Sequence, residues 1–190
     1  INGETEAGIT TMKMDVGLDT GDILLAHKVP INDDDDAQSL HDTLAQKGSD
    51  LVLETLNQFD FGSLEGTSQN IELASYAPKL KKEDGLIQWD QPAVKIHNLV
   101  RGLAPWPGAF SFLESKRFKI CKTEIKSCDS SNQPGVILRI SGCGIEVGTQ
   151  SKKIIITELQ PEGKKRMDVK SFLAGHKLSI GSKFEKQSSL

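Results

Sequence analysis

The chain has 190 residues, 37% of them hydrophobic and 26% charged, and a net charge of −3 at pH 7. This length allows one medium domain or two small ones, and the composition is ordinary for a soluble globular protein. No apolar run is long enough to span a bilayer, and no basic-then-apolar signal segment opens the sequence, so we expect no membrane partner.

The charge is unevenly divided along the chain. Residues 1–78 hold three Lys or Arg and fifteen Asp or Glu, whereas residues 79–190 hold twenty and eleven. This split predicts two units with different partners. A basic second unit favours a polyanion such as nucleic acid, but a solvated basic surface explains the same charge, and both interpretations stay open.

Residues 8–15 and 23–31 show the alternation of two β-strands, joined by the Gly-rich loop 16–22. Residues 32–59 predict a helix, with the acidic run 32–36 as its cap near the positive end of the helix dipole. The run lacks the spaced ligands and central glycine of a calcium loop. The expected apolar face of this helix consists of Leu40, Leu44, Leu51, Val52 and Leu56, with Gly48 in the middle.

The segment from about residue 62 to residue 89 is rich in Gly, Ser and Lys, which indicates a linker. Residues 90–103 predict a helix, with Asp90 as a possible cap and Pro92 in its first turn. The apolar side of that helix is Val94, Ile96, Leu99, Val100 and Leu103. A closing helix is expected at 167–178. The strand-like runs between these helices are 109–114, 117–125, 135–141, 144–149 and 152–160, and their lengths favour a small antiparallel barrel.

The three cysteines, Cys121, Cys128 and Cys143, form no CxxC pair and are odd in number. Such cysteines favour reduced thiols over a disulfide framework or a zinc site. We therefore predict a cytoplasmic protein without a bound metal.

The Asp-Thr-Gly triplet at residues 19–21 occurs in aspartic proteases, but those enzymes need two such motifs whose carboxylates share a proton. This chain has one, and the extra carboxylate of Asp22 would perturb the sharing. On periodicity alone a plain hairpin loop is favoured, because Gly and Asp are common in turns.

Four stretches together carry a resemblance to a known family. They are LDTGD (18–22), YAPKLKKEDGLIQWD (76–90), RGLAPWPGAFSFL (101–113) and LQPEGKKRMDVKSFLAG (159–175). In this order they resemble the formyltransferases that use formyltetrahydrofolate, and within them the branch that acts on methionyl-tRNA. The resemblance covers essentially the whole chain.

The resemblance implies an α/β plus β architecture. Residues 1–62 are expected to be the C-terminal part of a Rossmann-like formyltransferase domain, 63–89 a linker, and 90–190 an OB-like barrel that binds tRNA. The implied reaction transfers a formyl group from 10-formyltetrahydrofolate to the amino group of methionine on initiator tRNA. A monomer is expected for the full-length enzyme.

Asp19 matches the family's catalytic aspartate, and Val16, Gly17, Leu18 and Asp19 match the backbone that lies against the pterin ring. Asp15 and Asp22 are expected to be loop scaffolding. The family's upstream Asn-x-His pair and SLLP-type loop do not occur here. We therefore expect a truncated chain that is inactive alone, with structural roles for the four histidines, His27, His41, His97 and His176.

The resemblance also implies phosphate contacts from basic residues of the second half. The expected contacts are Lys79, Lys81, Lys82, Lys164, Lys165 and Arg166. The pairs 116–117 and 152–153 are expected to be ordinary surface, and Trp89 and Trp106 to be packing residues. Two other functions stay open: a stand-alone RNA-binding barrel, and a formyltransferase for a small amine or nucleotide sugar.

Overall fold

The computed structural model describes residues 1–126 and 133–186, and the chain forms two compact units. Glu4–Lys79 make up the hairpin unit, and Ile1–Gly3 with Leu80–Leu190 make up the sheet unit. The boundary between Lys79 and Leu80 lies inside the segment 63–89. The first part of the expected linker therefore belongs with the hairpin unit, and its last part with the sheet unit.

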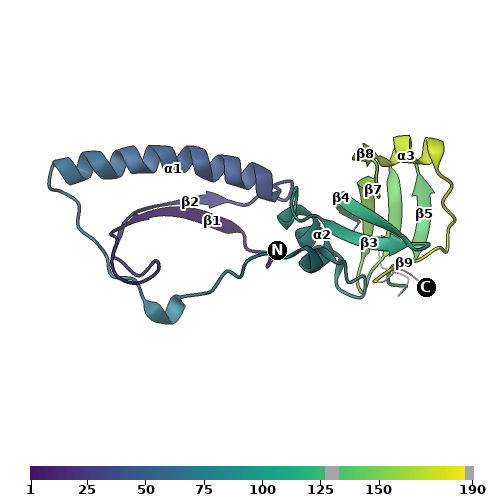
Figure 1. The fold of residues 1–190 in the computed structure, drawn as a ribbon, viewed down its shortest axis with the longest axis horizontal. Helices are drawn as coiled ribbons and strands as arrows, with labels where there is room; N and C mark the ends of the chain where they lie inside the picture. Colours follow the sequence, from purple (N-terminus) through teal and green to yellow (C-terminus); the bar gives the residue numbers. More distant parts are fainter. Residues whose placement is uncertain (127–132, 187–190) are drawn as a thin grey trace. The chain divides into compact units, whose positions relative to one another are not determined.

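The hairpin unit has one antiparallel strand pair covered by one long helix (Figure 1). The predicted strands are present as β1 (Glu6–Met12) and β2 (Ile23–Pro30), paired with Ile9 opposite His27. Helix α1 (Ala37–Asp60) lies along them. After α1 the chain is extended, apart from the single 3₁₀ turn η1 (Ile71–Leu73).

Helix α1 begins where the acidic run predicts it. Asp36 is the N-cap, and its side chain accepts hydrogen bonds from the backbone N–H groups of Gln38 and Ser39. The expected apolar face is partly wrong, because Val52 is 47% exposed and Leu56 is 56% exposed. The face that packs on the strands instead follows Leu44, Gly48, Leu51 and Thr55.

Two contacts explain this face. A Cβ built on Gly48 would lie 2.6 Å from the Cδ1 atom of Ile9, so glycine lets the helix approach β1 closely. Further along, the hydroxyls of Thr11 and Thr55 are hydrogen-bonded at 2.8 Å. Small and polar residues thus make the contact where apolar ones were expected.

The sheet unit is a curled antiparallel sheet in the order β5-β6-β7-β4-β3-β9, with β8 paired to β7. Its strands are β3 (Ala109–Leu113), β4 (Lys116–Lys126), β5 (Ile137–Ser141), β6 (Gly144–Gly148), β7 (Lys153–Pro161), β8 (Met167–Asp168) and β9 (Phe184–Glu185). Residues just before β9 also pair with residues just before β5, through the Val136–Lys183 bridge. The Phe184 N–H donates to the Gly135 carbonyl at 2.8 Å, so the two ends of the sheet meet.

Two α-helices and a 3₁₀ turn complete this unit (Figure 1). They are η2 (Lys82–Gly85), α2 (Ala93–Gly102) and α3 (Val169–Gly175). The Asp168 side chain caps α3 by accepting from the Ser171 N–H at 2.7 Å. The expected cap at Asp90 is wrong, because Pro92 occupies the N-cap position and Asp90 pairs with Lys186 at 3.2 Å.

The core of the sheet unit holds Trp89, which is 3% exposed and donates from Nε1 to the Ser111 hydroxyl. The packing role predicted for Trp89 is therefore confirmed. The same prediction is wrong for Trp106, which is 56% exposed. Val94 of α2 also points away from the core, at 52% exposure. Within residues 1–126 and 133–186, no helix combines the length and apolar character needed to cross a membrane.

Candidate active site

The connection between β1 and β2 is closed at its base by a tight backbone approach. The Lys13 N–H donates to the Asp22 carbonyl at 3.0 Å. A Cβ built on Gly21 would overlap the Lys13 carbonyl oxygen, so only glycine fits this position. The two ends of loop 13–22 are therefore held together by a fixed backbone contact.

Asp15 holds the first half of the loop together. Its Oδ1 atom accepts from the Gly17 N–H at 2.8 Å and from the Thr20 hydroxyl at 2.5 Å. These bonds, the Thr20 bond first, lower the pKa of Asp15 below its ordinary value. Asp15 is thus an anion engaged within the loop, as predicted for a scaffold residue.

Asp22 is engaged on the other side. Its Oδ1 atom accepts from the Ser68 hydroxyl at 3.1 Å, and its Oδ2 atom lies 3.9 Å from the Lys13 ammonium. A Cβ built on Gly66 would meet the Asp22 side chain at 2.7 Å, so the 66–68 segment packs directly against this carboxylate. Asp22 too fits its predicted scaffold role.

Asp19 differs from both neighbours. Its side chain is exposed and, among the residues that the structure describes, has no hydrogen-bond or ion-pair partner. Its backbone has a φ of 55°, which is uncommon for a non-glycine residue, although Asp tolerates it better than most. Its carbonyl accepts from Gln69 Nε2 at 2.8 Å. The loop fixes the backbone of Asp19 and leaves the carboxylate available.

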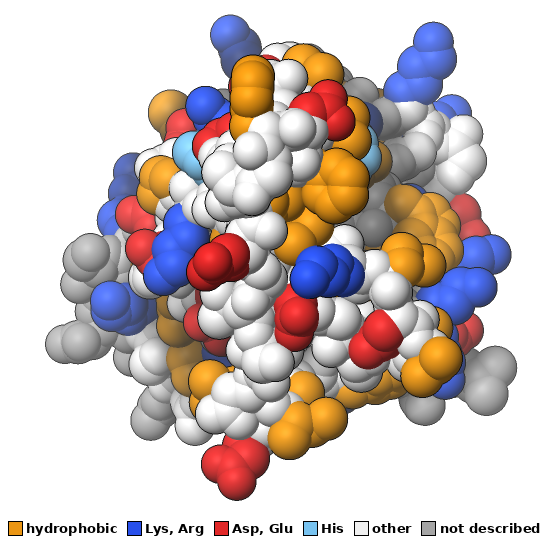
Figure 2. Space-filling view, turned by 90° about the vertical axis from the view of Figure 1, so that its left-hand side faces the viewer, with side chains coloured by type: hydrophobic (Ala, Val, Ile, Leu, Met, Phe, Trp, Pro, Cys, Tyr) orange, Lys and Arg blue, Asp and Glu red, His pale blue; other side chains and the backbone are white. Residues whose placement is uncertain are grey.

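Two of the expected folate-contact residues, Val16 and Leu18, present apolar side chains to solvent. Val16 is 108% exposed and Leu18 is 95% exposed, relative to an open reference chain. The space-filling view likewise shows hydrophobic side chains at the surface among charged ones (Figure 2). The Gly17 N–H is already bonded to Asp15, so this particular amide is not free to bind a ligand.

No histidine of the described chain contacts Asp19. His27 lies exposed in β2, and the ring of His41 is bonded to Asp42 at 3.1 Å. His97 is bonded to the Thr123 hydroxyl at 3.0 Å, and His176 stacks on Phe172. In the sheet unit these rings have packing partners, in keeping with the structural roles expected for them.

The expected tRNA contacts are exposed on the segments where the sequence placed them. Lys81 and Lys82 are at η2, and Lys164 and Lys165 lie in the turn between β7 and β8. Arg166 in that turn is different, because its Nε donates to Glu158 at 2.6 Å. Lys79 is the last residue of the hairpin unit and is also exposed.

Two cations that were not predicted as contacts lie between these clusters, on β4. The Arg117 guanidinium stacks 3.9 Å above the Phe110 ring, and the Lys119 side chain lies against Gly108. Gly85 of η2 lies against the same ring, because a Cβ built on Gly85 would be 3.3 Å from the Phe110 Cδ1 atom. The alternation of β4 placed these cations on the outer face, but only the tertiary fold brings η2 beside them.

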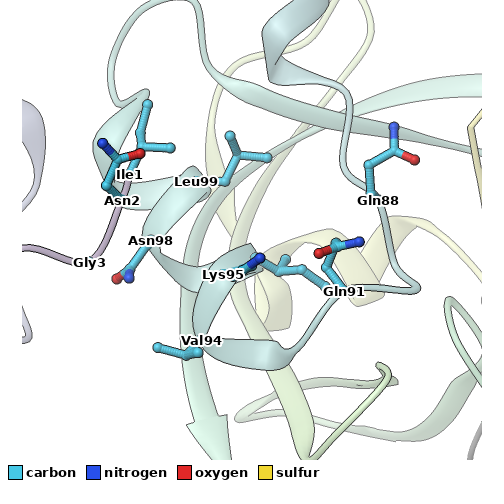
Figure 3. Close-up of a pocket in the computed structure, with 10 residues that line it drawn as sticks. Ile1, Asn2, Gly3, Gln88, Gln91, Val94, Lys95, Asn98 and Leu99 are labelled. Carbon is cyan, nitrogen blue, oxygen red and sulfur yellow. The ribbon is translucent and has the colours of Figure 1, made fainter. Parts of the chain in front are cut away.

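A hollow of about 680 Å³ lies beside α2 (Figure 3). Its described lining is amide-rich and apolar, holds the single cation Lys95 and contains no carboxylate or imidazole. The labelled side chains around it are Ile1, Asn2, Gln88, Gln91, Val94, Lys95, Asn98 and Leu99, with the backbone of Gly3. None of the sequence-predicted site residues lines this hollow.

Among the described residues, no three His, Cys, Asp or Glu side chains are placed to hold a metal ion. Cys121 and Cys143 are free thiols, and burial raises the pKa of Cys121. Cys128 lies outside the described residues.

Comparison with family models places this geometry in a known context. The model described as formyl transferase, C-terminal domain, matches residues 79–177, and the model described as formyl transferase matches residues 1–56. The chain belongs to the formyl transferase family. The recognition from the four sequence stretches is thereby confirmed at the level of the family.

One curated relative is the methionyl-tRNA formyltransferase of Citrifermentans bemidjiense. It is 50% identical over 181 residues, which cover 95% of this chain and 56% of that protein. This chain thus spans little more than half the length of the relative. A second relative, from Geobacter sulfurreducens, carries the same name at 49% identity and is covered to 57%.

Solved structures share the fold. HypX from Aquifex aeolicus, in complex with tetrahydrofolic acid, superposes with a TM-score of 0.66 at 19% identity, covering 94% of this chain and 34% of that one. An N-formyltransferase from Helicobacter canadensis, in complex with folinic acid and dTDP-3-aminofucose, gives a TM-score of 0.65 at 23% identity, covering 82% and 56%. At this identity the likeness establishes the fold alone.

Proposed function

We propose that this chain is part of an enzyme that transfers a formyl group from 10-formyltetrahydrofolate to the amino group of methionine on initiator tRNA, with Asp19 as a catalytic residue. The observation that supports it is the contrast within the loop. Asp15 and Asp22 are engaged, whereas the Asp19 carboxylate is free on a held backbone. Relatives named methionyl-tRNA formyltransferase at 50% and 49% identity support the substrate.

The chemistry explains why a free carboxylate is useful here. An amine that attacks a formyl carbon must lose a proton, and negative charge develops on the formyl oxygen. A carboxylate next to an imidazole orients the ring and stabilises its protonated form. The described residues place no imidazole beside Asp19, so a catalytic imidazole must come from a partner outside them.

The loop also fits a flat folate ring. Val16 and Leu18 expose apolar surface beside Asp19, and contact with a ring would remove that surface from water. The donor supplies the formyl carbon. The chain's own contribution is to hold the ring beside the carboxylate through the backbone of residues 16–19. Neighbours with bound tetrahydrofolic acid or folinic acid support a folate-derived donor.

We assign tRNA binding to the sheet unit, which we interpret as an OB-like barrel. Its exposed cations lie beside an aromatic ring, an arrangement suited to a phosphate backbone. Lys81 and Lys82 supply contacts at η2, Lys164, Lys165 and Arg166 supply the turn contacts, and Lys79 adds a contact from the end of the hairpin unit. Arg117 lies next to both clusters of the sheet unit, since its guanidinium stacks on Phe110, which touches η2, and its carbonyl accepts from the Glu162 N–H at 3.1 Å.

A titration with initiator tRNA at low and moderate salt tests this binding surface. Lys164→Ala/Lys165→Ala should weaken binding and reduce the slope of log affinity against log salt by about 1 to 2, because each phosphate contact contributes roughly 0.7–0.9. Lys177→Ala/Lys183→Ala removes equal charge from other exposed positions of the unit and should have a smaller effect. Equal losses in both variants would show only a general charge effect.

Formyl transfer in the full natural protein tests the chemistry. Asp19→Asn should lower kcat by about a hundredfold or more, the scale of a lost proton-transfer group. Asp60→Asn at the exposed end of α1 is the control and should leave kcat unchanged. The 190-residue chain alone should show no turnover, and measurable turnover would overturn the expectation that other catalytic groups are required.

The nucleotide-sugar alternative keeps one supporting observation, the shared fold with an N-formyltransferase crystallised with dTDP-3-aminofucose. It predicts no affinity for tRNA at any salt concentration. A stand-alone RNA-binding barrel, in contrast, predicts tRNA binding that is unaffected by any change in loop 13–22, together with no formyl transfer by the full natural protein.

A further inference from the structure

The segment that follows α1 packs against the loop that carries Asp19. Thr67 and Ile23 exchange two backbone hydrogen bonds, both 2.8 Å long, so the segment is fixed at the start of β2. Ser68 then bonds to Asp22, and Gln69 reaches the loop itself. Three consecutive residues thus contact a stretch of chain nearly fifty positions earlier.

Gln69 makes the most specific of these contacts. Its Nε2 atom donates to the carbonyl of Asp19 at 2.8 Å and to the carbonyl of Gly21 at 2.7 Å. A side-chain amide nitrogen has two hydrogens, so one group can satisfy both carbonyls at once. The two carbonyls flank Thr20, whose hydroxyl is bonded to Asp15. The Gln69 amide therefore holds the Asp19–Thr20 and Gly21–Asp22 peptide units together.

This arrangement matters because of the backbone of Asp19. A non-glycine residue at φ 55° persists only when its surroundings hold it there. This backbone sets the direction of the Cα–Cβ bond of Asp19, and so the region that its carboxylate reaches, since the side chain has no partner of its own among the described residues. The Gln69 amide is the side-chain donor that the structure shows on the Asp19 carbonyl.

We propose that Gln69 is a positioning residue for Asp19, acting through its two side-chain N–H groups to hold the backbone conformation from which the carboxylate reaches the reacting groups. The inference rests on the proposed function, since it assumes that Asp19 takes part in the chemistry. It assigns a role to the segment between α1 and the sheet unit, which the sequence treats as a linker.

Gln69→Met in the full natural protein tests the proposal, because methionine matches glutamine in length and has no N–H donor. We expect kcat to fall about tenfold to a hundredfold, the scale of a misplaced catalytic group, while KM for tRNA stays within about twofold. Gln58→Met is the matched control, since Gln58 is also bonded by its amide, to Glu54 on the exposed side of α1. A kcat within twofold of the parent for Gln69→Met would overturn the proposal.

A double variant separates positioning from a general loss of structure. If Gln69 acts through Asp19, adding Gln69→Met to Asp19→Asn should cause no further loss of kcat. A full additional loss would mean that Gln69 acts elsewhere. The Asp19→Asn single variant tests the proposed function by itself: an unchanged kcat there removes the catalytic role of Asp19, whatever Gln69 does.

A spectroscopic measurement gives a readout that does not depend on activity. With the Asp19 carbonyl carbon labelled, Gln69→Met should shift its NMR resonance, because the carbonyl loses its donor, and Gln58→Met should not. An unchanged resonance in the folded Gln69→Met protein would show that the contact is not formed in solution, which would equally overturn the proposal.

Discussion

The hairpin unit and the sheet unit divide stability and chemistry between them. Among the described residues, the hairpin unit buries only two apolar side chains fully, Val29 and Leu51, whereas the sheet unit buries a continuous cluster that runs from Ile87 to Phe184. Most of the large apolar side chains that are exposed among the described residues belong to the hairpin unit. These include Val16, Leu18, Val52, Leu53, Leu56, Phe59, Phe61, Ile71, Leu73 and Tyr76.

The two units keep their functional residues in place by different means. Apolar burial stabilises by about 25 cal/mol per Å², so the sheet unit can hold its cations on a rigid sheet. The hairpin unit has little such burial and fixes Asp19 with polar contacts instead, through Asp15, Ser68 and Gln69. Single polar substitutions should therefore disturb the loop. In the sheet unit, only core substitutions should disturb the cationic face, by which we mean the proposed tRNA contacts at η2, on β4 and in the turn 164–166.

The largest expected effect on stability lies in the core of the sheet unit. Phe172 is 1% exposed and meets Phe118 edge-on at 5.8 Å. Phe172→Ala should cost about 3–5 kcal/mol of unfolding free energy, because a large buried ring leaves a cavity. Denaturant unfolding followed by Trp89 fluorescence measures this loss, since Trp89 belongs to the same core. A loss below about 1 kcal/mol would contradict the core described for this unit.

The next effect tests the smaller core of the hairpin unit. Leu51 is 6% exposed, whereas Leu53, two positions along α1, is 63% exposed. Leu51→Ala should cost about 2–4 kcal/mol and Leu53→Ala less than about 0.5, because the residue change is identical and only burial differs. Amide hydrogen exchange of α1 reports the loss for this unit alone. Similar losses in both variants would mean that Leu53 is covered in solution.

The strands and α1 show which parts of the fold the sequence could predict. Strands β3 to β7 lie within about two residues of their predicted ranges. Alternation marks β4 and β7, and short apolar runs bounded by turn residues mark the others. Strands β8 and β9 were missed, since two residues carry no periodicity. On α1 the apolar pattern selected Val52 and Leu56, but close packing against Ile9 selected the face with Gly48 and Thr55.

The candidate site also contains residues that the sequence could predict and residues that it could not. Asp19 came from a resemblance, because periodicity alone favours a plain hairpin loop. The distinction between Asp19 and its acidic neighbours became physical only with the bonds of Asp15 and Asp22. Gln69 could not be predicted, because its contact joins residues 50 positions apart and depends on how the segment folds back. Arg117 was expected to be ordinary surface, since nothing in sequence places Phe110 beneath it.

A partly buried ion pair between Glu146 and Lys126 makes the sheet unit sensitive to acid. The Glu146 side chain is 11% exposed and accepts from Lys126 at 2.7 Å. That bond, together with the nearby charges of Arg139 and Lys153, lowers the pKa of Glu146 below its ordinary value of 4.5. Since the folded pKa is the lower one, the stabilisation is complete above about pH 4.5 and is lost as pH falls through the folded value.

Glu146→Gln tests this pair. We expect a loss of about 1 kcal/mol at pH 7, because glutamine keeps an acceptor for the half-exposed Lys126 and removes only the charge attraction, and a flatter dependence of stability on pH below 4.5. Unfolding midpoints at pH 7 and pH 4 measure both. An unchanged pH dependence would show that other carboxyls, such as the Asp168 cap with its lowered pKa, account for the acid sensitivity.

The start of α1 offers a smaller test of the hairpin unit. Asp36→Ala removes the side chain that accepts from the N–H groups of Gln38 and Ser39. The expected loss is about 1 kcal/mol, the usual value for an N-cap. Asp34→Ala is the control, because its exposed side chain belongs to the same acidic run and takes no part in the cap. Equal losses would mean that the charge near the helix dipole matters more than the cap.

The smallest expected effect concerns the turn between β7 and β8. Arg166 is bonded to Glu158 at 2.6 Å, so part of its capacity to bind phosphate is already used. Glu158→Gln removes a negative charge from the cationic face and loosens its hold on Arg166, so tRNA affinity should rise by a few fold at low salt. In the Arg166→Ala background the same change should give less, because only the charge effect remains. If Glu158→Gln weakens binding instead, the Arg166–Glu158 pair is itself the structure that tRNA recognises, and the cationic face acts by shape as well as by charge.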